Sequence, residues 1–129
     1  MPSNEPRGFA EAKRRARAYA QNPRKAGHLL TDAINKAYQH RTQLRAIWHD
    51  LMSLICMLKA LCNGLYRRVP WRALILSLAS VVYFLNPFDL APDFIPGIGY
   101  VDDALVLTFV VNSIRKEINQ FLQWEQGVE

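Results

Sequence analysis

Residues 73–85 read ALILSLASVVYFL, and no charged residue occurs between positions 73 and 88. A helix formed by this stretch has no polar face, so it must be buried either in protein or in lipid. Its charge-free length is about 24 Å at a rise of ~1.5 Å per residue. This is shorter than the ~30 Å of hydrocarbon in a bilayer. How the chain buries this stretch therefore decides its fold.

A second apolar helix is expected from about Asp102, which is a good N-cap residue, to about Leu122. Its first part, ALVLTFVV (104–111), is apolar all round, and it becomes amphipathic after Asn112. The connection between the two arms contains the turn-forming residues Pro87, Pro92, Pro96, Gly97 and Gly99. These prolines exclude a continuous helix and the glycines permit tight turns, so the pattern predicts a helical hairpin.

The N-terminal half predicts further helices. One is expected from Phe9 to Ala20, ending at Asn22-Pro23. From Leu30 to Leu65, apolar residues recur at steps of four and three, with one gap at Arg41. A coiled-coil dimer is one interpretation of this stripe. The stripe is wider than a two-stranded seam, so we favour one or two bundle helices with a break near Arg41.

Together these patterns predict an all-α fold, a small bundle of four to five helices centred on the helix–Pro/Gly/Asp loop–helix hairpin. The 129 residues fit one domain. We expect basic amphipathic helices in residues 1–66 and the hairpin with its acidic loop in residues 67–125, packed together as one compact domain.

Charge is distributed unevenly along the chain. Residues 1–48 carry ten lysines and arginines against three acidic residues, whereas residues 87–129 carry two against seven. This favours a basic surface for lipid phosphates, with four contacts expected in the first helix: Lys13, Arg14, Arg15 and Arg17. A solvated basic helix is the alternative. Nucleic acid is a weaker partner hypothesis, because the segment lacks interleaved aromatic residues and any nucleic-acid-binding motif.

The flanks of the hairpin suggest a membrane. Basic residues lie at the same end of both arms: Arg67, Arg68 and Arg72 on one, Arg115 and Lys116 on the other. The positive-inside rule expects this of a hairpin with cytoplasmic ends, with Tyr66 and Trp71 at the interface. We therefore predict a membrane-associated chain with a transmembrane helix or a shallower hairpin.

The alternative, favoured by the short length of the apolar stretch, is a soluble cytoplasmic bundle with 73–85 as its central helix. That bundle would be an interaction module that self-associates through the 30–65 stripe.

Four carboxylates lie within fifteen residues of the loop: Asp89, Asp93, Asp102 and Asp103. Such a cluster is a candidate site for Mg²⁺ or Ca²⁺, although it matches no calcium-loop motif. In the other interpretation, Asp102 caps the last helix while Asp89 and Asp93 accept backbone hydrogen bonds in turns. No nucleophile or histidine pair accompanies the cluster, so we predict no catalytic residue, cofactor or small-molecule substrate.

The segment from Tyr83 to Asp103, YFLNPFDLAPDFIPGIGYVDD, resembles the signature of the YkvA-like family, domain of unknown function 1232. It keeps a proline two residues before an aspartate, a Pro-Asp pair, a Pro-Gly pair and a final Asp-Asp. It departs from the signature at Asn86, where serine is commoner, and at Ala91, where a larger aliphatic residue is commoner. The resemblance extends to 18–25, 70–72, 113–116 and 121–125, which look like bacterial members.

This resemblance implies membrane association, with no shared enzymatic activity and no catalytic residues to carry over. We expect the chain on the cytoplasmic side of a bacterial inner membrane. A related domain occurs beside a RING domain in a membrane-bound ubiquitin ligase. The family resemblance therefore implies a membrane or interaction module, with membrane lipid as the expected partner and a protein partner or homo-oligomer as a further possibility.

Overall fold

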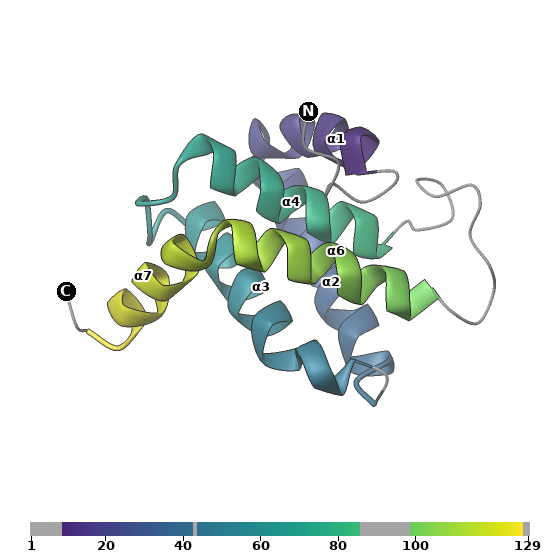
Figure 1. Cartoon of the computed structure of the whole chain (residues 1–129). Helices are drawn as coiled ribbons and strands as arrows, with labels where there is room; N and C mark the ends of the chain where they lie inside the picture. The colour runs from purple at the N-terminus through teal and green to yellow at the C-terminus, as the bar shows by residue number, and fades with distance from the viewer. Residues whose placement is uncertain (1–8, 43, 86–98, 128–129) are drawn as a thin grey trace.

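Helix α4 (Trp71–Leu85) runs through the centre of an all-helical fold, in which the computed structural model describes residues 9–42, 44–85 and 99–127 (Figure 1). For residues 99–105 the description covers the backbone. The other helices are α1 (Phe9–Ala20), α2 (Pro23–Gln39), α3 (Trp48–Cys62), α6 (Gly99–Ser113) and α7 (Arg115–Glu125), with a 3-10 helix at Arg45–Ile47. No strand occurs in these ranges, so the all-α prediction is confirmed.

The contacts of α4 explain how the apolar stretch is buried. Every residue from Ile75 to Phe84 is buried, and α4 packs against α1, α2, α3 and α6. The inner face of α1 consists of Phe9, Ala12 and Ala16, all fully buried. The short alanine side chains allow two helix backbones to approach closely. The stretch without a polar face is thus enclosed by protein, as the helical-bundle interpretation expected.

Within the described ranges, no helix combines the length and the hydrophobicity needed to cross a membrane. The 15 residues of α4 extend about 22 Å at ~1.5 Å per residue, which is less than the ~30 Å hydrocarbon core. This finding corrects the expectation of a transmembrane helix for the part of the chain that the structure describes.

The N-terminal helices follow the sequence pattern closely. α1 ends at Ala20, as predicted, and Asn22 and Pro23 then begin α2. α2 ends at Gln39 and α3 begins at Trp48, so the predicted break near Arg41 is confirmed. Leucines 30, 51 and 58 of the stripe are almost fully buried, because α2 and α3 pack on each other and on α4.

The C-terminal part differs from the prediction of one helix starting near Asp102. α6 already begins at Gly99, so Asp102 lies inside the helix rather than at its N-cap. The helix ends at Ser113, and α7 starts after Ile114, whose φ of −124° and ψ of 26° depart from helical values. The described ranges therefore hold six α-helices instead of four to five. The break lets Ile118 and Phe121 of α7 become buried.

One polar contact joins the ends of α2 and α4. The Lys36 Nζ donates a hydrogen bond to the Phe84 carbonyl oxygen at 2.6 Å and lies 4.9 Å from the centre of the Phe84 ring. A cation at a helix C-terminus is favourable because it meets the negative end of the helix dipole. α4 ends and α6 begins at this same end of the bundle (Figure 1).

Candidate functional site

Most of the predicted loop site lies outside the described residues: Asp89, Asp93, Pro87, Pro92, Pro96 and Gly97. Gly99 is the first residue of α6, and Asp102 and Asp103 belong to its first turns. The divalent-cation site therefore stays a prediction. Among the described residues, no group of three or more histidine, cysteine or acidic side chains is placed to hold a metal ion.

The four basic residues predicted as lipid contacts on α1 have different surroundings. The Lys13 Nζ lies 5.9 Å from the centre of the Phe9 ring, whereas the Arg17 side chain is exposed. Arg14 and Arg15 both donate to the carboxylate of Glu11, from their Nε atoms at 2.9 and 3.2 Å. A second Arg14 nitrogen, Nη2, also donates to this carboxylate. Glu11 thus holds two guanidinium groups side by side.

The charges of this trio are stable at neutral pH. The hydrogen bond from Arg14, and then that from Arg15, lowers the pKa of the Glu11 carboxyl, while Glu11 raises the pKa of Arg14. A lowered carboxyl pKa means that the contacts persist at neutral pH and are lost only when acid protonates Glu11. The trio is exposed, so its effect on folding is small, and it groups the two guanidinium groups around one carboxylate.

Arg14 and Arg15 line a pocket of about 510 Å³ between α1 and α2. α1 also contributes Tyr19, and α2 contributes residues spaced at one helical turn: Lys25, His28 and Asp32. Ala18 and Leu29 supply apolar wall. The pocket brings together cations from two helices. Lys25 and His28 are not among the predicted contacts, although their spacing and the nearby Asn22-Pro23 turn place them beside the basic helix.

Asn22 fixes the start of α2 and therefore one wall of the pocket. Its Oδ1 accepts a hydrogen bond from the Lys25 backbone N–H at 3.2 Å, and Pro23 occupies the first helical turn. Both are typical of a helix N-terminus.

Replacing Asn22 with alanine is expected to lower the free energy of unfolding by ~1 kcal/mol, because the N-cap acceptor is lost. Urea unfolding followed by circular dichroism measures this change. Asn22→Asp keeps an acceptor oxygen and is the matched control. An equal loss in both variants would contradict a capping role.

A second hollow of about 320 Å³ adjoins the first one, since both are lined by His28. It lies between the start of α2 and the end of α3, with Arg24 and Lys59 on its two sides and Cys62 in its wall. Burial raises the pKa of the Cys62 thiol, and also that of Cys56. Both thiols are therefore protonated at neutral pH and poorly suited to act as nucleophiles.

The chain leaves α3 through a glycine turn and enters an exposed basic segment. Gly64 has a φ of 75°, and the N–H groups of Gly64 and Leu65 donate to the carbonyls of Leu61 and Ala60. This is the Schellman pattern, which needs a residue that tolerates positive φ. Beyond it, Leu65 is 67% and Trp71 54% exposed. The basic side chains of this segment are also exposed: Arg67, Arg68 and Arg72.

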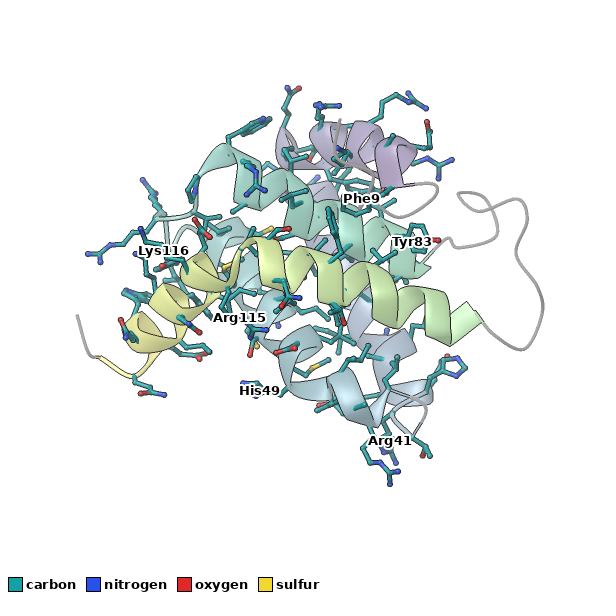
Figure 2. All side chains as sticks on the ribbon, viewed as in Figure 1. Phe9, Arg41, His49, Tyr83, Arg115 and Lys116 are labelled. Atoms are coloured by element: carbon teal, nitrogen blue, oxygen red, sulfur yellow. The ribbon has the colours of Figure 1, made fainter. Side chains whose placement is uncertain are left out.

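Tyr66 does not lie at a surface, which corrects its predicted place at a membrane interface. It is 2% exposed, and its ring centre lies 5.2 Å from that of Phe121 and 4.9 Å from that of Trp124. Through this aromatic cluster, the α3–α4 connection packs against α7. Figure 2 shows Lys116 at the same end of the bundle and Arg41 at the opposite end.

Comparison with known proteins gives two matches. Residues 73–109 match the family described as a protein of unknown function, DUF1232. The chain is 33% identical over 101 residues to a protein of Bacillus subtilis (strain 168) named "Uncharacterized membrane protein YkvA". This alignment covers 78% of the chain and 95% of the relative. No solved structure matches the chain.

Proposed function

Because the chain belongs to the YkvA-like family of unknown function, DUF1232, and its Bacillus relative is named a membrane protein, we propose that it attaches to anionic membranes. The proposed attachment surface is the connection from α3 to α4, comprising Leu65, Arg67, Arg68, Trp71 and Arg72. The proposal assigns no reaction to the chain.

The observation that carries the proposal is the exposure of two large apolar side chains among these arginines. In the described part of the chain, the exposed large hydrophobic residues are Tyr38, Leu65 and Trp71, so two of the three lie in this segment. The residue after a Schellman glycine commonly packs back on its helix, but Leu65 is 67% exposed. Leu65 is therefore available to enter lipid.

The chemistry of the segment fits the headgroup region of a bilayer. Tryptophan is enriched at this level, because its ring is apolar while its N–H forms hydrogen bonds. Each Lys or Arg near an anionic leaflet contributes ~1 kcal/mol, so the three arginines together contribute about 3 kcal/mol, or roughly a hundredfold in affinity. Lys59, which is exposed in the last turn of α3, extends this surface across the same end of the bundle.

Attachment at this end requires no insertion of α4. The helix is enclosed by α1, α2, α3 and α6, so the proposal replaces the inserted hairpin with surface docking. The cytoplasmic side of the membrane, self-association and the cation site in the loop remain predictions.

Vesicle sedimentation with the full chain tests the proposal. The protein is expected to sediment with vesicles that contain both phosphatidylcholine and phosphatidylglycerol. With vesicles made only of phosphatidylcholine, the protein should remain in the supernatant. Added salt should weaken binding, since it screens exposed charges. Replacing Arg67 and Arg72 with glutamine should reduce the affinity by about thirtyfold, at ~1 kcal/mol for each charge.

The matched control removes two arginines from the opposite end of the bundle. Arg41 and Arg45 are both exposed, and their double replacement with glutamine lowers the net charge by the same amount. This control is expected to change the affinity by less than about threefold. Equal losses in the two double variants, or equal binding to both kinds of vesicle, would refute a localised membrane surface.

A further inference from the structure

The pocket between α1 and α2 has the size of a small-molecule site. Its volume of about 510 Å³ lies within the range of roughly 300–1,000 Å³ that is usual for ligand pockets. Its polar side chains come from both helices, so a ligand there would bridge α1 and α2. The apolar side chains of Ala18 and Leu29 also line the pocket, beside these polar groups.

Three cations line this pocket: Arg14, Arg15 and Lys25. Guanidinium groups present paired N–H donors that match the oxygens of a phosphate, and lysine adds a compact positive charge. Tyr19 and His28 contribute further groups capable of donating hydrogen bonds. A phosphate monoester offers three terminal oxygens and close to two negative charges at neutral pH, which suits this set of donors.

The two arginines are grouped by one carboxylate in the structure, which contains no ligand. Both donate to Glu11, and Glu11 itself is not part of the pocket lining. Side chains that are already ordered lose less conformational entropy when they bind. The Glu11 contact therefore favours an anion site over a loose group of surface charges.

Asp32 gives the pocket a second kind of polar group. Its carboxylate is part of the lining and repels a phosphate, but it accepts hydrogen bonds from hydroxyl groups. A ligand that satisfies both the cations and Asp32 carries a phosphate and free hydroxyls on the same small framework.

From these observations we infer that the α1–α2 pocket binds the phosphate monoester of a polyol, such as glycerol 3-phosphate. The same chemistry occurs in a soluble ester and in the headgroup of a lipid phosphomonoester. The inference does not depend on the membrane surface at the α3–α4 connection, because the two sites share no residue.

Titration calorimetry of the full chain with glycerol 3-phosphate tests the site. Saturable binding to one site per chain is expected. Replacing Arg15 and Lys25 with glutamine should weaken it by about a hundredfold, because two charge-assisted hydrogen bonds are lost. The matched control is Arg17→Gln with Arg24→Gln, which removes the same charge from the same two helices outside this pocket. We expect less than about a threefold effect from the control.

Vesicles distinguish the two sources of the phosphate. Phosphatidic acid carries a phosphate monoester and phosphatidylglycerol a diester, so the lipid source predicts preferential binding to phosphatidic acid at equal molar fraction. This preference should disappear in the Arg15/Lys25 double variant. A soluble source predicts calorimetric binding of glycerol 3-phosphate without that preference.

Two results would overturn the inference. One is the absence both of saturable glycerol 3-phosphate binding and of a preference for phosphatidic acid. The other is an equal loss in the pocket and control double variants, both shown to be folded by circular dichroism. If instead the membrane proposal fails, the results differ. Replacing Arg67 and Arg72 would then not change binding to phosphatidylglycerol vesicles, while calorimetric binding of glycerol 3-phosphate would be unaffected.

Discussion

Replacing Phe121 with alanine is expected to lower the free energy of unfolding by about 3–5 kcal/mol, the usual range for removal of a buried aromatic ring. Phe121 is 1% exposed, and its ring centre lies 5.2 Å from that of Tyr66 and 5.8 Å from that of Trp124. The loss leaves a cavity where α7 holds the α3–α4 connection. Against a typical total of about 5–15 kcal/mol, such a loss is large.

Urea unfolding measures the change, and near-ultraviolet circular dichroism reports the packing of the aromatic cluster. Gln120→Ala, at an exposed neighbouring position of α7, is the control and should stay within about 0.5 kcal/mol of the parent protein. Unchanged stability of Phe121→Ala would show that α7 does not pack as described.

Replacing Leu78 with alanine is expected to cost about 2–5 kcal/mol in detergent-free buffer. Leu78 is 1% exposed near the middle of α4, where protein encloses it on all sides. The substitution tests whether the apolar stretch is a protein core, because a side chain that faced lipid would not stabilise the folded chain in water.

Leu65→Ala provides the matched control for Leu78, since it removes the same atoms from a side chain that is 67% exposed. Its expected effect on unfolding is within about 0.5 kcal/mol. Similar effects of the two substitutions on urea unfolding would contradict the central position of α4. Together the two variants separate the apolar residues that form the core from those available to a membrane.

Much of the helical framework is predictable because local signals mark it. Asn22-Pro23 both ends α1 and starts α2, since the proline disfavours helix before it and suits the first turn after it. The gap of the apolar stripe at Arg41 marks the connection from α2 to α3. The charge-free stretch of residues 73–85 requires a buried helix, although it leaves open whether protein or lipid buries it.

The break at Ile114 has no comparable local signal. No glycine or proline occurs between Tyr100 and Gln126, so the pattern reads as one helix that changes from apolar to amphipathic. The break depends on tertiary packing, because α7 must turn to place Ile118 and Phe121 against the bundle. The start of α6 at Gly99 likewise differs from the prediction, since Asp102 resembles an N-cap residue.

The candidate site was predictable only in part. The sequence shows how many basic residues α1 carries, but which of them share a pocket depends on how α1 crosses α2. Arg14 and Arg15 join Lys25 and His28, whereas Lys13 and Arg17 do not. The sequence correctly assigned the family, because the segment from Tyr83 to Asp103 is long and specific.

The length of α4 sets the distance between the proposed membrane surface and the opposite end of the bundle. With the α3–α4 connection against a bilayer, the helix begins near the lipid headgroups and ends at Leu85, about 22 Å along its axis. The Lys36 contact with Phe84 ties that far end to α2, and α6 begins on the same side. In that orientation α4 would act as a rigid spacer that holds the start of α6 away from the bilayer.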